Sequence, residues 1–389
     1  MSDIIQSIRN LFKPVKPIAP GIYHFQAPPD DERNYRLHLR VEADGSSVLI
    51  VNAATVLHLN YTATEYAYYL IQNLSTDQVV QEMASRYHVD AAEARKDYQD
   101  FSSRIMTLIN TPDLDPVTFL DFERHEPFSG AISAPYRLDC ALTYRLPGAG
   151  QEGAAPVERV SKELNTQEWN TILDKAYQAG IPHVVFTGGE ATLRDDLQTL
   201  IQHAEDLGMV SGLLSDGLRL ADEDYLNQLL QTGLDHLMMV LEPDEKQAWT
   251  ALENAMAADL FVAVHLTLTQ DNQERIPKLL QQLAQKEVHA ISLTTGDPTL
   301  QDVLHKNRER VADLGMELIW NLPVPYSRNN PVTLETQEDD GAEGAGKAWL
   351  YVEPDGDVLP GQGINEVGGQ AAVMGNLLSD PWEKIWKPN

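Results

Sequence analysis

The sequence predicts an α/β protein: a partial (β/α)6 TIM-like barrel, preceded by a winged-helix-like α+β domain and followed by a short C-terminal segment. Three observations lead to this fold class. Between residues 136 and 325, apolar strand-like runs alternate with helical patterns about six times, as in a parallel sheet covered by helices. Three strand patterns and three helical patterns come before this stretch, and a hairpin with a Pro-Asp-Gly turn comes after it. Six units are too few for a closed eight-stranded barrel.

Residues 1–17 are predicted to contain a short amphipathic helix, because apolar residues recur at helical spacing between Ile4 and Phe12. Such a helix either docks onto a partner or a lipid surface, or packs on its own protein. Only Arg9 and Lys13 offer it a basic face, which favours the second interpretation.

Residues 18–112 are predicted to form one small α+β domain. Strands with period-two alternation are expected over 35–42, 47–52 and 54–60. Three helices follow, and the third begins after the N-cap Asp90 and carries an apolar stripe that ends at Leu108. The residues from 113 to 135 are expected to form a linker.

Residues 136–325 are expected to form the barrel. His183, His236 and His289 fall at strand starts, opposite the end that binds ligands in such folds, so we expect them to be structural. Cys140 falls inside a strand and is expected to be a small buried hydrophobic residue. An acidic linker and a C-terminal segment are expected over 326–346 and 347–389.

The composition excludes several functions. The 389 residues include 29 basic and 58 acidic side chains, and the formal charge of −29 argues against nucleic acid and anionic membranes. No apolar run reaches the length of about 18 residues that a membrane-spanning helix needs. The N-terminus contains Asp3 and no long apolar stretch, so no secretory signal is predicted and a cytoplasmic location is expected.

Polar and acidic residues follow the predicted barrel strands at their carboxyl ends, where α/β sheets bind ligands. They are Gly188, Gly189, Glu190, Ser215, Asp216 and Glu242. Adjacent glycines let a ligand approach the backbone closely, and carboxylates suit an amine or ribose hydroxyls. A small-molecule pocket is therefore favoured over a purely structural turn. The glycine-bearing loop over 146–156 lacks the lysine of a phosphate-binding loop.

Four motifs resemble the radical S-adenosylmethionine superfamily in sequence and in order. They are LTYR at 142–145, FTGGEATLRDDL at 186–197, SDGLRL at 215–220 and VHLTLTQDN at 264–272. In that family the TGGE element follows the second strand and binds the methionine amine of S-adenosylmethionine. The resemblance implies that Gly188, Gly189, Glu190, Ser215 and Asp216 line a residual S-adenosylmethionine-like pocket.

Two flanking regions extend the resemblance to maturases of ribosomally made peptides. Residues 49–75 resemble a PqqD-like precursor-recognition element, in which a leader peptide adds as a strand beside the third strand. The C-terminal segment is similar to a SPASM-type segment. The resemblance implies peptide contacts at Val56, Leu57, His58 and Leu59. The alternative is a structural cap that binds nothing, since exposed sheet edges are usually covered.

The departure from the family concerns its iron–sulfur cluster. A C-x3-C-x2-C pattern holds a [4Fe–4S] cluster in the family, and its three positions are Leu146, Gly150 and Gly153 here. In the SPASM-like segment, Gly361 follows Pro360 where the family has a cysteine. Leucine and glycine offer iron no donor atom, so the chain alone is expected to hold no cluster and to be a pseudoenzyme.

Three functions remain open at this stage. The leading hypothesis is a catalytically inactive homologue that binds a precursor (leader) peptide, or an active maturase partner, in peptide natural-product maturation; it needs no cofactor. The second is an enzyme that binds S-adenosylmethionine or another small ligand beside Glu190, Asp216 and Glu242 for non-radical chemistry. The third is a radical enzyme whose cluster is completed by the thiolates of a partner. The acidic charge favours a neutral or basic peptide.

Overall fold

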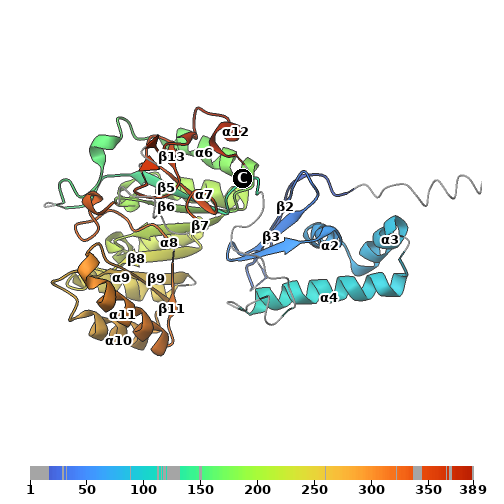
Figure 1. Cartoon of the computed structure of the whole chain (residues 1–389). Helices are drawn as coiled ribbons and strands as arrows, with labels where there is room; N and C mark the ends of the chain where they lie inside the picture. Colours follow the sequence, from blue (N-terminus) through green and yellow to red (C-terminus); the bar gives the residue numbers. More distant parts are fainter. Residues whose placement is uncertain are drawn as a thin grey trace, which may run out of the picture. The chain divides into compact units, whose positions relative to one another are not determined.

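The computed structural model describes the chain from residue 17 to residue 387 with short gaps, and Figure 1 shows its elements. It leaves out 1–16, 29, 32, 88, 112–113, 115, 117–119, 121–131, 149–150, 259, 321, 336–343, 365, 368–369 and 388–389. The predicted N-terminal helix, Gly150, most of the predicted linker over 113–135 and the centre of the acidic linker therefore lie outside the described residues. The chain divides into two compact units, Met1–Ser129 and Gly130–Asn389.

The N-terminal unit contains a four-stranded antiparallel sheet in the order β1-β2-β3-β4, followed by three described helices. Their bounds are β1 Gly21–Gln26, β2 Arg36–Val41, β3 Ser47–Val51, β4 Thr55–Leu59, α2 Tyr61–Ile71, α3 Thr76–Tyr87 and α4 Ala91–Asn110. The sequence predicts three strands here and misses β1. No residue of β1 is fully buried, so it lacks the strong apolar pattern that marks β2 and β3.

The helices of this unit begin at side-chain caps and pack on one face of the sheet. Asn60 Oδ1 accepts a hydrogen bond from the Ala63 N–H at 2.9 Å, and Asp90 Oδ1 accepts one from Ala92 N–H at 2.8 Å. The predicted apolar stripe of α4 is confirmed, and it joins residues of the sheet in one core. The buried residues are Ala94, Tyr98, Phe101, Ile105 and Leu108 of α4, and Leu37, Leu39, Leu49, Leu57 and Leu59 of the sheet.

The C-terminal unit is built on a ten-stranded sheet in the order β11-β10-β9-β8-β7-β6-β5-β12-β13-β16. Strands β5 to β11 are parallel and alternate with helices, which confirms the predicted α/β fold with a partial barrel. Within the described chain the sheet does not close, because β11 and β16 are its two edges. The strands are β5 Arg137–Thr143, β6 His183–Gly188, β7 Val210–Ser215, β8 His236–Val240, β9 Phe261–Thr267, β10 Ala290–Thr294 and β11 Glu317–Leu318. The helices are α6 Thr166–Ala179, α7 Leu197–Leu207, α8 Glu223–Gln231, α9 Lys246–Ala257, α10 Ile276–Gln285 and α11 Gln301–Asp313.

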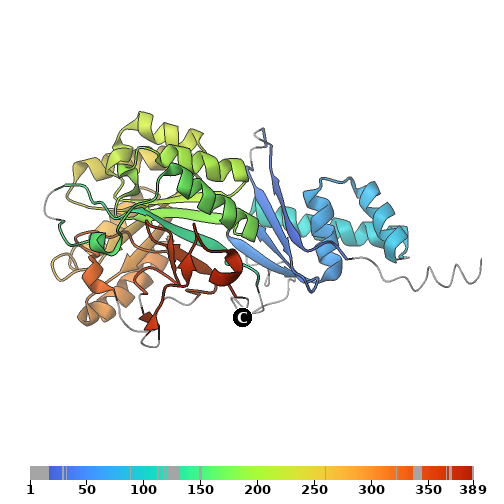
Figure 2. The ribbon, with the colours of Figure 1, turned by 90° about the horizontal axis from the view of Figure 1, so that it is seen from above.

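The C-terminal segment continues the same sheet. Its strand β12 pairs in parallel with β5, the first strand of the barrel, and forms the predicted hairpin with β13 (Figure 2). A short helix, α12, follows near the C-terminus. The bounds are β12 Trp349–Val352, β13 Asp357–Leu359, β14 Glu366–Val367, β15 Gln370–Ala371, β16 Gly375–Asn376 and α12 Trp382–Ile385. The sequence predicts the hairpin but not its place beside β5.

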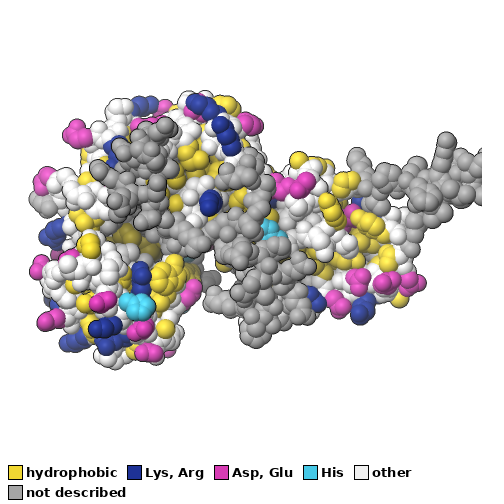
Figure 3. Space-filling view, in the orientation of Figure 1, with side chains coloured by type: hydrophobic (Ala, Val, Ile, Leu, Met, Phe, Trp, Pro, Cys, Tyr) yellow, Lys and Arg dark blue, Asp and Glu magenta, His cyan; other side chains and the backbone are white. Residues whose placement is uncertain are grey.

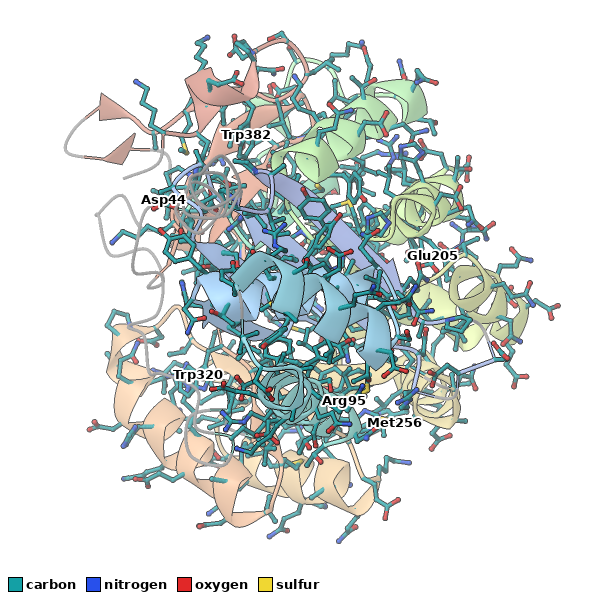
Figure 4. All side chains as sticks on the ribbon, turned by 90° about the vertical axis from the view of Figure 1, so that its right-hand side faces the viewer. Asp44, Arg95, Glu205, Met256, Trp320 and Trp382 are labelled. Atoms are coloured by element: carbon teal, nitrogen blue, oxygen red, sulfur yellow. The ribbon has the colours of Figure 1, made fainter. Side chains whose placement is uncertain are left out.

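The two faces of the large sheet bury different side chains. The outer face packs against the helices in a large apolar core, which includes Cys140 with no exposed surface, as predicted. The side chains of Glu205 on α7 and Met256 on α9 lie among these outer helices (Figure 4). The inner face carries a smaller cluster, against which Ile319 and Leu322 pack. Its buried members are Val185, Leu214, Met238, Ala263 and Ala290.

The three histidines predicted to be structural lie at the starts of strands. The Nε2 atoms of His183 and His236 are 2.7 Å apart, and the imidazole of His236 fills the space beside Gly212, where a Cβ would collide with it. His289 Nδ1 accepts a hydrogen bond from the N–H of Val262 at 3.0 Å. All three are therefore engaged in packing at the end of the sheet opposite the rim described below.

Two surface features bear on the functions considered above. Acidic side chains are scattered over both units in Figure 3 and do not form one patch on this face. Within the part of the chain that the structure describes, no helix combines the length and apolarity needed to cross a bilayer.

Candidate functional site

The glycine pair of the TGGE element lies at the carboxyl end of β6, beside the end of β5. Gly188 has φ +124°, and a Cβ at this position would overlap the carbonyl oxygen of Thr143. A Cβ at Gly189 would overlap the carbonyl oxygen of Arg145. Backbone hydrogen bonds join these two segments. The Gly189 N–H donates to the carbonyl oxygen of Thr143 at 2.8 Å, and the Glu190 N–H donates to that of Arg145 at 2.9 Å. Both glycines are therefore required by the close approach of two backbone segments.

Glu190 is buried beside the end of β7, with 3% of its surface exposed. Its Oε1 accepts hydrogen bonds from Thr192 N–H at 2.9 Å, Thr192 Oγ1 at 2.6 Å and Ser215 Oγ at 2.8 Å. Its Oε2 accepts one from the N–H of Asp216 at 2.8 Å. The structure therefore brings Glu190, Ser215 and Asp216 together, and the carboxylate of Glu190 is satisfied by groups of the chain itself.

The carboxyl ends of the parallel strands, where Glu190, Asp216 and Glu242 lie, are called the rim below. The other two carboxyl groups of the rim, those of Asp216 and Glu242, have raised pKa values. Burial and then the charge of Glu190 raise the pKa of Asp216 to about 7. Burial also raises the pKa of Glu242, against the opposing charge of Arg328. The Glu242 charge also contributes to the shift at Asp216, so the three predicted rim carboxylates form one electrostatic group.

A segment after β11, residues 322–335, runs along this rim and is called the crossing segment below. The backbone N–H of Tyr326 donates to the carbonyl oxygen of Gly188 at 2.9 Å. The side-chain amide of Asn329 donates to Glu242 Oε1 at 3.0 Å. Tyr326 is almost completely buried, with 2% of its surface exposed. The crossing segment therefore binds two of the strand ends where the sequence predicts a ligand, and no sequence signal indicated it.

The loop after β5 packs against the crossing segment through an apolar cluster. Leu146, the first of the three positions that correspond to cluster ligands, packs against its members. The buried members are Ala141, Tyr144, Ala155, Tyr326, Tyr351 and Leu359. The N–H of Val332 donates to the carbonyl oxygen of Ala154 at 2.7 Å, which ties the loop to the crossing segment. Gly153, the third position, has φ +78° and no atom within 4 Å of where its Cβ would be.

A buried ion-pair network joins three distant parts of the chain behind this cluster. Arg159, in the loop, donates from Nη2 to Glu335 Oε2 at 2.6 Å and from Nη1 to Glu353 Oε1 at 3.2 Å. The hydroxyl of Tyr144 also donates to Glu353 Oε1 at 2.9 Å. Burial lowers the pKa of Arg159, but hydrogen bonding to Glu335 and the charges of both carboxylates raise it above its ordinary value. Sequence reasoning missed this network because its members have no common spacing.

His265 lies on the inner face of the sheet, within a second polar group that the sequence did not predict. It is fully buried, and burial lowers its pKa to about 3, so it is neutral at physiological pH. Its Nδ1 is 3.0 Å from Ser292 Oγ, and its Nε2 is 2.9 Å from Thr267 Oγ1. A neutral imidazole satisfied on both nitrogens has the geometry of a structural histidine.

The predicted peptide-contact residues lie on β4, in the N-terminal unit. Leu57 and Leu59 are buried in the core of that unit, while Val56 and His58 point to the opposite face of the sheet. Among the described residues β4 pairs with β3 alone, so it is an edge strand. An edge strand presents one row of backbone donors and acceptors that a further strand can use.

No group of three or more His, Cys, Asp or Glu side chains in the described residues has the arrangement of a metal site. Leu146 and Gly153 carry no donor atom, and Cys140 is enclosed in the outer core. The described residues therefore do not fit a [4Fe–4S] cluster.

Comparison with known structures shows which folds this one is similar to. The fold matches that of Streptococcus suis SuiB. Streptococcus suis SuiB bound to its precursor peptide SuiA superposes with a TM-score of 0.57 at 12% identity, over 93% of this chain and 88% of SuiB. SuiB bound to S-adenosylmethionine gives a TM-score of 0.55 over the same shares of the two chains.

The chain is also related in sequence to a peptide-modifying protein. It is 26% identical to the PqqA peptide cyclase of Streptomyces rochei over 290 residues, which cover 66% of this chain and 76% of the cyclase. No protein-family profile matches the chain. The comparisons therefore show a fold like that of SuiB and distant homology to a PqqA peptide cyclase.

Proposed function

We propose that this protein is a non-catalytic relative of the radical S-adenosylmethionine peptide maturases that binds a precursor peptide or an active maturase partner. The observation that carries the proposal is the apolar cluster around Leu146, Tyr144 and Tyr326. Leu146 stands at a position that corresponds to a cluster ligand, and it contributes packing in place of a thiolate. A cluster iron requires such donors, so no radical step is derived for this chain.

The hydrogen bonds at the rim support the same proposal. The resemblance assigns the methionine amine of S-adenosylmethionine to the TGGE element. Here the carbonyl of Gly188 accepts from Tyr326, and the oxygens of Glu190 accept from Thr192, Ser215 and Asp216. Three donors of the chain already occupy Oε1 of Glu190, so an incoming amine could bond only to the remaining lone pair of Oε2, which disfavours the cofactor.

Peptide binding is proposed for residues 18–112, with the leader peptide added as a strand beside β4. Main-chain hydrogen bonds would supply the affinity, and side chains next to Val56 and His58 on one face and Leu57 and Leu59 on the other would supply the specificity. SuiB has been crystallised with its precursor peptide, which supports a peptide as the ligand of this chain. We further propose that residues 347–389 are a degenerate SPASM-like segment, because they keep the β12–β13 hairpin and lack the cysteine after Pro360.

Calorimetric titration of the full chain tests the peptide proposal. The probes are synthetic peptides for each short reading frame encoded beside the gene, and the variants are Val56→Asp on β4 and Ile22→Asp on β1. Both side chains are half-buried on edge strands of the same sheet, so the second variant is a matched control for strand addition at the wrong edge. We expect Val56→Asp to weaken binding about tenfold or more, and Ile22→Asp to leave it unchanged.

The titration has two outcomes that contradict the proposal. Failure of every peptide to bind the wild type at high micromolar concentration removes the peptide ligand. Equal weakening by both variants removes the assignment to β4. Circular dichroism of each variant establishes that the comparison is made between folded proteins.

The raised pKa of Asp216 favours a second candidate function, binding of S-adenosylmethionine or another ligand at the rim for non-radical chemistry. Calorimetry with S-adenosylmethionine, repeated on Glu190→Ala, separates it from the first. Heat of binding that disappears in Glu190→Ala supports the second candidate, and a wild type that gives no heat removes it.

A further inference from the structure

A separate pocket in the C-terminal unit has no role in the function proposed above. It lies between the end of β10, the crossing segment and the region of β12 and β13, and its volume is about 290 Å³. Pockets for drug-sized ligands have volumes of about 300–1,000 Å³, so this one suits a smaller group, such as a single long side chain. The residues that carry the argument are Asp139, Tyr326, Leu334, Glu335, Trp349 and Gln362.

The charged side chains that line the pocket are both acidic. They are Asp139 and Glu335, and no Lys, Arg or His is found among the described lining residues. Glu335 is already paired with Arg159 at 2.6 Å and accepts a hydrogen bond from the hydroxyl of Tyr326, so Asp139 is the carboxylate on which the argument depends. Asp139 is 2% exposed and binds Arg137 through both oxygens, Oδ1 to Nε at 2.7 Å and Oδ2 to Nη2 at 3.0 Å. Asp139 lines the pocket and Arg137 does not, so the carboxylate of this ion pair faces the pocket. Each carboxylate oxygen has a second lone pair that can accept a hydrogen bond.

Apolar and amide surfaces complete the pocket. Trp349 is 7% exposed and presents a flat apolar surface, and the guanidinium of Arg137 lies 4.9 Å from its ring centroid. Leu334 is 39% exposed and therefore lies where the pocket meets solvent. Gln362 uses its Nε2 to bind the carbonyl of Val324 at 2.7 Å, which leaves its Oε1 as an acceptor. Apolar walls together with a negatively charged hydrogen-bond acceptor suit a cationic group at the end of an apolar stem.

We infer that this pocket binds an ammonium or guanidinium group on an apolar stem, the side chain of a lysine or arginine in the bound peptide. This inference rests on the proposed function in one respect, namely that the ligand is part of a peptide. A free diamine has the same chemistry, so the test must separate the two sources. The chain's formal charge of −29 favours the approach of either cation.

Calorimetry on the full chain tests the inference with three probes. They are the tripeptide acetyl-Gly-Lys-Gly-amide, its norleucine analogue with the same stem and no charge, and cadaverine. Asp139→Asn removes the acceptor charge, and Leu334→Trp fills the mouth of the pocket without touching the Arg137 ion pair. Asp313→Asn is the control for the loss of one negative charge, because Asp313 lies at the exposed end of α11 and does not line the pocket.

We expect the lysine tripeptide to bind the wild type and the control equally, and to bind both pocket variants about tenfold or more weakly. The norleucine peptide should be weaker by a similar factor. Equal binding of the norleucine peptide, or undiminished binding by Leu334→Trp, overturns the inference even if Asp139→Asn fails to fold. Binding of cadaverine without the tripeptide overturns the peptide as the source.

The two proposals fail separately. A chain that binds its leader peptide but not the lysine tripeptide refutes the pocket and leaves the proposed function. A chain that binds the tripeptide but no leader peptide refutes the leader peptide as the ligand of the proposed function and leaves a cation site.

Discussion

The backbone N–H of Asp216 donates to Oε2 of Glu190 at 2.8 Å, so that two carboxyl groups from neighbouring strand ends lie together at the rim. Burial and the charge of Glu190 raise the pKa of Asp216 to about 7. A protonated aspartic acid presents one acceptor and one donor, as an asparagine side chain does. A protonated Asp216 can therefore both donate and accept a hydrogen bond at the rim.

This relationship predicts a pH dependence of stability. The pKa of Asp216 is about 7 in the folded chain and about 3.9 in an unfolded chain, so the folded state holds the extra proton between these values. The contribution of Asp216 to the free energy of unfolding should fall as the pH rises from about 4 to about 7, opposite in sign to that of the buried histidines, and Asp216→Asn should remove it. Urea unfolding across that range measures it. Asp313→Asn should follow the wild type, and parallel curves for wild type and Asp216→Asn contradict the prediction.

A second prediction concerns the ion-pair network. Arg159→Met leaves the carboxylates of Glu335 and Glu353 without their cation, and Glu353 is 4% exposed. Removing one partner of a buried pair costs about 3–5 kcal/mol, and the partial exposure of Arg159 reduces this to about 2 kcal/mol. Thermal and urea unfolding should both detect the loss.

The control for this prediction removes the charges together. The triple variant Arg159→Met, Glu335→Gln, Glu353→Gln has no uncompensated carboxylate and should recover part of the lost stability. If Arg159→Met is as stable as the wild type, the ion-pair network does not stabilise the loop after β5. A triple variant less stable than the single one assigns the loss to the packing of Arg159 and not to its charge.

The sequence predicted the parts of this protein that depend on local pattern. Alternating strands and helices predict a parallel sheet, and carboxyl ends of parallel strands meet at one edge, which is why Glu190 and Asp216 were expected together. The pairing of β12 with β5 joins residues about 200 positions apart in the chain, and pairing at such separation has no periodicity to reveal it. The contacts of Tyr326 and Arg159 were missed for the same reason, because their partners are distant in the sequence and come together only in the folded chain.

Glycine substitutions test the close approach of β5 and β6. Gly188→Ala would place a Cβ against the carbonyl oxygen of Thr143 at a φ of +124°, so a loss of more than about 3 kcal/mol, or failure to fold, is expected. Gly153→Ala is the matched control, because its φ is also positive but its Cβ would meet no atom within 4 Å. It should cost about 1 kcal/mol. Equal effects on the melting temperature would show that the backbone contact is not the cause.

The last prediction concerns His265 and the acid side of the stability curve. Burial lowers its pKa to about 3, while an unfolded chain has a histidine pKa of about 6.5. The unfolded state therefore binds the extra proton between these values, and stability that is complete above about pH 6.5 should be lost as the pH falls toward about 3. The slope attributable to His265 is about 1.4 kcal/mol per pH unit in the middle of this range.

His265→Gln should make the free energy of unfolding less steep with pH in that range, because the glutamine does not titrate. It should also lower stability at neutral pH, since Ser292 and Thr267 lose a partner. His305→Gln, at an exposed position of α11, is the matched control and should leave the slope unchanged. His236, at the start of β8, contributes to the remaining slope, because burial and the charge of Arg137 lower its pKa to about 4. If His265→Gln keeps the wild-type dependence of the free energy of unfolding on pH, then the imidazole of His265 in the wild type is already protonated in the folded protein. The buried polar group on the inner face must then hold a charge and a counter-ion.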